Sequence, residues 1–189
     1  MSLRGHQLKD LTCAEIGVYK GENALSMLKS ADNIKDLYLI DTYAHQDKWF
    51  TDNIGQVFPD KDMADMFMES VKDKFLPYGN KVHFIRKDSC LSANDFPNES
   101  FDYVYIDGGH DYDIVKKDIN AWYPKIKPYG VLGGHDISYH DVSKAITEFS
   151  VNNKIMTFMM NIIQFKTIPQ EFNDLHDWFI FKFPDNGHP

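Results

Sequence analysis

Short apolar runs that end in glycine, acid and histidine residues constrain the fold of this chain more than any other feature. Residues 102–112 read DYVYIDGGHDY, and residues 131–136 read VLGGHD. Apolar runs of this length are typical of buried strands. Acids and histidines just past strand ends stand where open α/β sheets bind their ligands. We therefore expect the two strand ends to face one cleft.

A third strand end suggests what that cleft binds. Residues 13–21, CAEIGVYKG, run from an apolar segment into glycines, and a helical pattern follows from Asn23 to Lys29. A strand-to-helix turn with glycines lets a ligand approach the backbone and the helix N-terminus. A further apolar run ends at Asp41, and an acid about 20 residues after such a turn is placed to accept hydrogen bonds from ribose hydroxyls. The pattern predicts a nucleoside site.

Strand and helix patterns alternate along the chain. Strands are expected at about 11–17, 36–41, 81–86, 103–107, 131–134 and 178–183, and helices at about 22–30, 60–75, 111–122 and 140–152. We expect a turn at 128–130 before the fifth strand, and an edge strand and core residues at 156–160. This alternation predicts an α/β fold with a doubly wound, mostly parallel sheet. With 189 residues and 43% hydrophobic content, a single domain spanning 1–189 is expected.

The charge balance narrows the class of partner. With 28 acidic and 20 basic residues, the net charge of −8 argues against nucleic acid or an anionic membrane as main partner. The acidity suits a cationic ligand, although an acidic surface also simply aids solubility. The two cysteines, Cys13 and Cys90, have no metal-ligand spacing. No signal-peptide core or 20-residue apolar span is present, so a cytoplasmic location is the expectation.

With these segments the chain resembles the class I S-adenosylmethionine-dependent methyltransferases. It is most similar to a small-molecule group with DGxHxY and GGHD segments, methyltransferase domain 24, and the likeness runs from about Thr12 to Phe149. The resemblance implies a Rossmann-like sheet of seven strands, with helices on both faces and a C-terminal antiparallel hairpin. Glu15-x-Gly17-x-x-x-Gly21 resembles the first motif, except that Tyr19 stands where many members have glycine.

The resemblance also implies which residues hold the cofactor. Glu15 faces its ammonium group, Asp41 binds its ribose, and Asp88 with Ser89 meets its adenine edge. Alternatives remain open, since Glu15 also suits a buried acid that caps nearby amides, Asp41 a helix or turn cap, and Asp88 a helix N-cap. The candidate cofactor-binding residues are Glu15, Gly17, Tyr19, Gly21, Asp41, Thr42, Asp88, Ser89, Asp107 and Gly108.

The acid and histidine residues after the fourth and fifth strands are the candidates for chemistry. Related O-methyltransferases hold a divalent ion there, which implies Asp107, His135 and Asp136 as metal ligands. Oxygen ligands favour Mg²⁺, and a histidine ligand shifts the preference toward Mn²⁺ and other transition metals. Asp107 and His110 are the candidate catalytic residues, with His110 as general base if no metal acts. The alternatives are that His135 and Asp136 cap a turn, and that His110 only hydrogen-bonds Asp107 or the backbone.

These observations predict a methyltransferase acting on a small-molecule acceptor, with a hydroxyl oxygen favoured. The alternatives are an NAD-dependent oxidoreductase, disfavoured because the first loop lacks G-x-G-x-x-G, a non-catalytic module that binds S-adenosylmethionine or S-adenosylhomocysteine, and a metal-dependent hydrolase. Tyr43, His45, Trp49 and Phe50 are expected either to cover the cofactor or line the acceptor pocket, or to pack as buried side chains under the loop. Because only about ten residues precede the first strand, where many relatives carry shielding helices, we also expect a homodimer.

Overall fold

The computed structural model describes residues 9–43, 61–159 and 176–184. Its strands and longer helices are β1 (Leu11–Ile16), α1 (Glu22–Ser30), β2 (Ile34–Asp41), α3 (Lys61–Phe75), β3 (Val82–Arg86), α4 (Ser89–Ala93), β4 (Phe101–Ile106), α5 (Tyr112–Trp122), β5 (Ile126–Gly134), α6 (His140–Asn153), β6 (Thr157–Met159) and β7 (Trp178–Phe181). Short 3-10 segments, Leu76–Lys81 and Tyr123–Lys125, follow α3 and α5.

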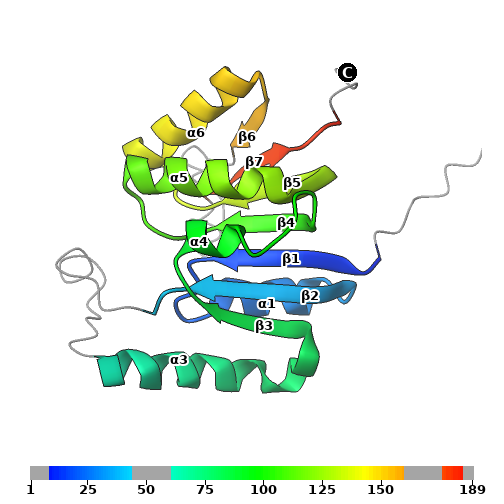
Figure 1. Cartoon of the computed structure of the whole chain (residues 1–189), viewed down its shortest axis with the longest axis vertical. Coiled ribbons are helices and arrows are strands. Elements are labelled where there is room, and N and C mark those ends of the chain that lie inside the picture. Colours follow the sequence, from blue (N-terminus) through cyan, green and yellow to red (C-terminus); the bar gives the residue numbers. More distant parts are fainter. Residues whose placement is uncertain (1–8, 44–60, 160–175, 185–189) are drawn as a thin grey trace, which may run out of the picture.

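The described strands form a seven-stranded sheet in the order β3-β2-β1-β4-β5-β7-β6 (Figure 1). Strands β1 to β5 pair in parallel, whereas β7 pairs antiparallel with both β5 and β6. This arrangement confirms the predicted Rossmann-like fold with an antiparallel C-terminal hairpin.

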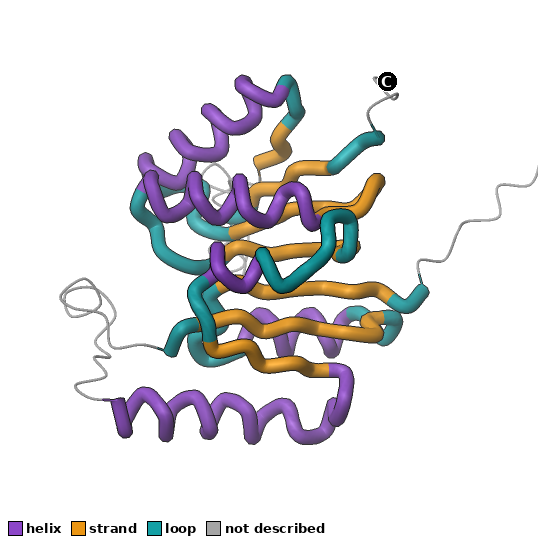
Figure 2. Tube along the Cα trace, viewed as in Figure 1, coloured by secondary structure: helices purple, strands orange, loops and turns teal. Residues whose placement is uncertain are grey.

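Helices lie on both sides of the sheet (Figure 2), and each side has its own apolar core. On α5, Val115, Ile119 and Trp122 recur at helical spacing and are buried with Val104 and Ile106 of β4. The opposite core joins α1 and α3 to the other faces of β1 and β2. Because both faces of the central strands are covered, their sequences are almost continuously apolar.

Strand register brings the predicted site residues together. Ile16 pairs with Ile106, and Ile106 pairs with Gly134. Since these strands are parallel, the segments that begin at Gly17, Asp107 and His135 lie next to one another at the carboxyl ends of the strands. This is the single cleft expected from the sequence.

The turn expected at residues 128–130 is wrong as a strand boundary. Strand β5 already begins at Ile126, and Tyr129 lies inside it with a positive φ of 66°. The Tyr129 amide donates to the Lys182 carbonyl at 2.6 Å, and the Lys182 amide donates to the Gly130 carbonyl at 3.0 Å. Pairing with the segment after β7 therefore carries the strand through a local distortion.

The structure differs from the sequence prediction at two further places. Helix α4 was not predicted, because its five residues are too short to show a helical period. Residues 156–159 were expected to contribute to the core, but Phe158 and Met159 are 48% and 49% exposed on the edge strand β6. Met160 lies outside the described residues.

Candidate active site

The loop after β1 is packed directly against the loop after β4. Gly17 has a φ of +82°, and a Cβ placed on it would lie 2.2 Å from the Asp107 carbonyl oxygen. The Asp107 amide donates to the Ile16 carbonyl at 2.7 Å. Only glycine allows this approach of two backbones, which explains the glycine in the first motif.

Asp41 fixes the shape of the same loop. Its Oδ2 accepts hydrogen bonds from the amides of Val18 and Tyr19 at 2.8 and 3.0 Å, and its Oδ1 accepts one from the Tyr43 amide at 2.8 Å. The turn-cap alternative is thus realised in this structure. A carboxylate has about four acceptor positions, so Asp41 retains acceptor capacity beside the loop where a ribose is expected.

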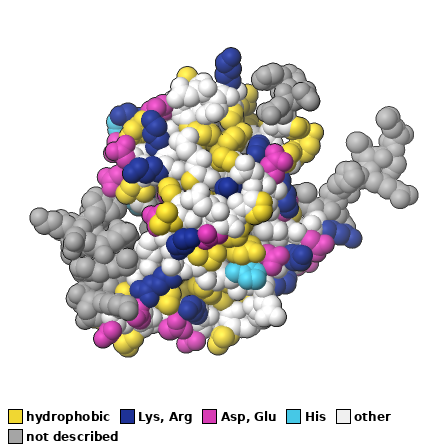
Figure 3. All heavy atoms as spheres, in the orientation of Figure 1, with side chains coloured by type: hydrophobic (Ala, Val, Ile, Leu, Met, Phe, Trp, Pro, Cys, Tyr) yellow, Lys and Arg dark blue, Asp and Glu magenta, His cyan; other side chains and the backbone are white. Residues whose placement is uncertain are grey.

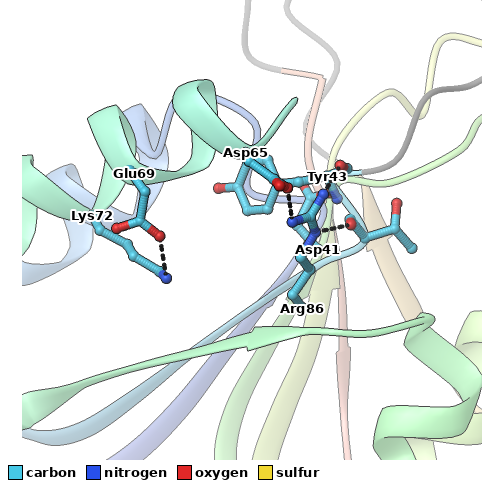
Figure 4. Close-up of polar contacts among 7 residues, drawn as sticks. Asp41, Tyr43, Asp65, Glu69, Lys72 and Arg86 are labelled. Atoms are coloured by element: carbon cyan, nitrogen blue, oxygen red, sulfur yellow. Dashed lines mark hydrogen bonds and ion pairs between the residues drawn. The ribbon is translucent and has the colours of Figure 1, made fainter. Parts of the chain in front are cut away.

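Arg86 holds the segment that follows Asp41, a role that the sequence reasoning missed. The guanidinium donates to the carbonyls of Thr42 and Tyr43 at 3.0 and 2.8 Å and pairs with Asp65 of α3 (Figure 4). Its signal was only a basic residue at the end of a predicted strand.

Tyr43 is the one expected pocket aromatic in the described residues. It is buried, and its hydroxyl donates to the Tyr19 carbonyl at 3.2 Å. It therefore packs beneath the loop, as the sequence alternative of buried packing had it. His45, Trp49 and Phe50 lie outside the described residues.

Glu15 is a buried acid at the end of β1 with 1% exposure. Its Oε1 accepts from the Asn23 side chain at 3.0 Å, whereas its Oε2 has no hydrogen-bond partner among the described residues. Burial raises the pKa of the carboxyl to about 8, although hydrogen bonds from Asn23 and the Ala24 backbone oppose this. A buried carboxyl with an unsatisfied oxygen favours a cationic neighbour.

The residues expected at the adenine edge follow β3. Asp88 is the N-cap of α4 and accepts from the Leu91 amide at 2.9 Å, which realises the cap alternative. The Ser89 hydroxyl accepts from the indole N–H of Trp122 at 2.8 Å and hydrogen-bonds Asp118. The Ser89 hydroxyl thus faces the protein interior.

The acid and histidine residues after β4 and β5 form one cluster centred on Asp136. His110 Nε2 lies 2.6 Å from Asp136 Oδ2, and His135 Nδ1 lies 3.1 Å from Asp136 Oδ1. His135 Nδ1 is also 4.0 Å from Asp107 Oδ1. Asp136 adopts a left-handed φ of 60°, which turns its carboxylate toward the two imidazoles.

The charges in the cluster are coupled. Burial works against ionisation of Asp136, but the hydrogen bonds with His110 and His135 together outweigh it and hold the Asp136 pKa well below its usual range. The hydrogen bond to Asp136 raises the pKa of His110. Burial raises the pKa of Asp107 to about 6, against the opposing effect of His135. The cluster thus keeps one firmly ionised carboxylate between two imidazoles.

Three of these side chains have the geometry of a cation site. Asp107, His110 and Asp136 each offer one ligand atom, and the three atoms lie within 4.8 Å of one another. This group contains His110, whereas the sequence predicted His135 as the third ligand; His135 lies beside Asp136. His110 follows β4 and His135 follows β5, the two strands that also precede Asp107 and Asp136, so sequence position could not choose between the histidines.

A cavity of about 10 Å³ lies over this cluster and is lined by Ile106, Asp107, Gly108, Gly109, His110, Val115, His135, Asp136, Val142 and Trp178. Ligand sites are usually roughly 300–1,000 Å³, so this cavity by itself has room for about one ion or water molecule. His110 Nε2 contacts Asp136, its Nδ1 is buried, and its ring stacks on Tyr139 at 5.1 Å. Asp107, with its side chain 33% exposed, is therefore better placed than His110 to meet an acceptor.

Trp178 supports the segment that carries Asp136 and was not singled out from the sequence. Its indole N–H donates to the His135 carbonyl at 3.1 Å, and a Cβ on Gly134 would lie 2.6 Å from its ring. The glycine pair at 133–134 was the available signal, since it permits such close packing.

Comparison with known proteins identifies the family. Residues 14–137, well over half of the chain, match the family model described as Methyltransferase domain. The chain belongs to the methyltransferase domain family. It is therefore an S-adenosylmethionine-dependent methyltransferase. The match covers the β1 glycine loop, Asp41, the β4 loop and the Asp136 segment together.

Solved structures share the fold at low sequence identity. The O-methyltransferase NovP matches with a TM-score of 0.62 and 16% identity over 93% of this chain and 73% of its own. A Staphylococcus aureus protein assigned as a caffeoyl-CoA O-methyltransferase gives 0.62 and 14% over 91% and 76%. Spermidine synthase from Thermotoga maritima gives 0.56 and 15% over 94% and 54%. Because the fold also serves that synthase, the fold alone does not define the acceptor.

A curated relative adds little about function. An uncharacterized protein, y4gI of Sinorhizobium fredii, is 36% identical over 52 residues, which is 28% of this chain. The aligned stretch spans only 6% of that protein's length.

The described part of the methyltransferase gives two further observations on partners. None of its helices has the length and apolarity needed to cross a membrane. Figure 3 shows acidic and basic side chains intermingled on the face that carries α5 and α6.

Proposed function

We propose that this methyltransferase methylates a hydroxyl oxygen of a small molecule with the help of a divalent cation held by Asp107, His110 and Asp136. The observation that carries the proposal is the position of this trio, because the Asp107 backbone is packed against Gly17 of the glycine loop. A group held by the trio therefore lies beside the loop expected to hold the cofactor. Two structural neighbours named as O-methyltransferases support the choice of oxygen.

The residues of the cleft fit S-adenosylmethionine, which the family implies. The buried Glu15 Oε2 lacks a partner among the described residues and suits the cofactor's ammonium group. Asp41 retains acceptor capacity for ribose hydroxyls, and Gly17 keeps the loop against the β4 end. Tyr19, Gly21, Thr42, Asp88, Ser89 and Gly108 complete the proposed cofactor-binding set. When bound, the cofactor supplies the activated methyl group.

The chain's own side chains then orient the acceptor and take its proton. A Mg²⁺ or Mn²⁺ ion at the trio would supply Lewis acidity, which lowers the pKa of a bound hydroxyl. Asp136 holds both imidazoles, so His110 and His135 keep fixed orientations. Asp107 borders both the glycine loop and the pocket and is the proposed proton acceptor.

Calorimetric titration followed by an acceptor screen tests the proposal. We expect micromolar binding of S-adenosylmethionine and S-adenosylhomocysteine and none of NAD. Methyl transfer to hydroxyl acceptors should disappear with EDTA and return with Mn²⁺ or Mg²⁺. Turnover that is indifferent to chelation would rule out the metal and leave Asp107 as a metal-free base. Binding of NAD instead would favour the oxidoreductase.

The expected homodimer remains a prediction. Sedimentation velocity at micromolar concentration measures it directly, and a single species with the mass of one chain would contradict it.

A further inference from the structure

Asp118 of α5 is a buried acid that neither the cofactor-binding set nor the proposed chemistry uses. It is 4% exposed, and no lysine or arginine in the described part of the chain forms an ion pair with it. Burying a carboxyl without a counterion is costly, so a residue that only filled the α4–α5 contact would be better replaced by an apolar one.

The hydrogen bonds of Asp118 all reach the first turn of α4. Its Oδ1 accepts from the Cys90 thiol at 3.6 Å, and its carboxyl is hydrogen-bonded to the Ser89 side chain. Trp122, one turn further along α5, donates to the same Ser89 hydroxyl at 2.8 Å. Two residues of α5, Asp118 and Trp122, therefore anchor the first turn of α4 by hydrogen bonds.

Asp118 is also near Gly108 in the loop that follows β4. A Cβ placed on Gly108 would meet Asp118 Oδ2 at 3.8 Å and no other atom within 4 Å. Gly108 directly follows Asp107, whose backbone packs on Gly17. The Asp118 carboxyl is thus hydrogen-bonded to the start of α4 and leaves room beside Gly108 for no more than a methyl group.

The β4 loop and the first turn of α4 border the place where a nucleoside is expected. The order in which strands are added to the sheet reverses between β1 and β4, because β2 and β3 extend the sheet to one side of β1 and β4 and β5 extend it to the other. Such a switch point is where open α/β sheets bind ligands. The Lys87 amide, just before α4, donates to the Asp41 carbonyl at 3.2 Å. The start of α4 therefore lies next to Asp41, the acid expected to bind the ribose.

We propose that Asp118 is a positioning residue that sets the distance between the β4 loop and the first turn of α4, and thereby shapes the nucleoside end of the cofactor crevice. The proposal rests on the cofactor that the family implies and not on the acceptor or the metal, so the two proposals fail in different experiments.

The test compares D118A and D118N with D102N as matched control. Asp102 is a half-buried acid that, like Asp118, accepts two hydrogen bonds, here from the Thr12 amide and from Lys127, but it lies at the opposite end of β4 from the crevice. Asparagine at 118 keeps the size of the side chain and one of its two oxygen acceptors. Thermal melting establishes that each variant is folded at the assay temperature.

The first readout is calorimetric affinity for S-adenosylhomocysteine and for adenosine alone. We expect D118A to weaken both by on the order of 10- to 100-fold, since small displacements of positioning groups have effects of this size. D118N should recover most of the loss, and D102N should bind like the wild type. Affinities of D118A within twofold of the wild type would overturn the proposal, as would a wild type that binds neither compound.

The second readout is the reactivity of Cys90 toward a disulfide reagent without any ligand. Burial and Asp118 raise the Cys90 pKa to about 11, and Cys13 is buried. Loss of Asp118 should speed the reaction of Cys90, and adenosine should slow it in the wild type. If D118A does not fold, D118S takes its place, because serine is too short to reach the first turn of α4, and affinities of D118S within twofold of the wild type would overturn the proposal.

Discussion

Glu15 should make the stability of the methyltransferase depend on pH in a window where few carboxyls titrate. The folded state raises its pKa from 4.5 to about 8, chiefly through burial. Between these values the folded protein holds a proton that the unfolded chain has released. Stability from this group is therefore complete below about pH 4.5 and is lost as the pH rises through 8.

The size of the effect follows from the shift. One pKa unit corresponds to about 1.4 kcal/mol, so the full shift amounts to about 5 kcal/mol across the whole range. Between pH 6.5 and 8.5 the same two pKa values give a loss of about 2 kcal/mol. A loss of that size is readily measured by urea unfolding, followed through tryptophan fluorescence.

E15Q removes the titration and keeps the shape and the acceptor for Asn23. We expect its free energy of unfolding to fall by about 2 kcal/mol less than that of the wild type between pH 6.5 and 8.5. His110, whose pKa is also raised, contributes equally to both proteins and cancels. E69Q, at an exposed acid paired with Lys72, is the control and should retain the wild-type slope. An E15Q variant that loses stability as steeply as the wild type would refute the reasoning.

Three further substitutions test the packing of the site. G17A should destabilise the fold by about 3 kcal/mol, because its Cβ would meet the Asp107 carbonyl at 2.2 Å; G79A, with a positive φ but open space, should cost only about 1 kcal/mol in the same urea titration. D136N should weaken Mn²⁺ binding by about 10–100-fold in calorimetry, and unchanged binding would remove Asp136 from the metal site. W178F deletes the donor to the His135 carbonyl and should cost about 1 kcal/mol of stability and slow methyl transfer, whereas a stable variant with full turnover would show that Trp178 does not position the segment.

The fold could be predicted because its signals are local. Each parallel strand is a short apolar run, and each central helix shows its apolar spacing over ten or more residues. The signal failed where it was too short or was overridden by pairing. Helix α4 has five residues, and β5 passes through Tyr129 only because Lys182, far along the chain, pairs with that segment.

The site could be predicted as a set of positions but not as a set of contacts. The proximity of Asp107 and Asp136 could be predicted, since both follow neighbouring parallel strands whose carboxyl ends lie side by side. Which histidine faces which carboxyl depends on the left-handed φ of Asp136 and on Trp178, neither of which sequence spacing encodes. The partners of Asp41 were likewise undecided, because a ribose and the loop amides both require an acceptor at the same place.

The buried acids Asp118 and Glu15 differ in their hydrogen-bond partners, and this difference suggests different roles for them. Asp118 has hydrogen bonds to Ser89 and Cys90 and a raised pKa, which suits a neutral or weakly charged brace between α5 and α4. Glu15 has an oxygen without a partner among the described residues, at the end of β1 beside the glycine loop. A cation arriving at Glu15 would favour its ionised form and lower its pKa. Cofactor binding should therefore release a proton at pH 7 in the wild type and not in E15Q, which calorimetry in buffers of different ionisation enthalpy measures directly.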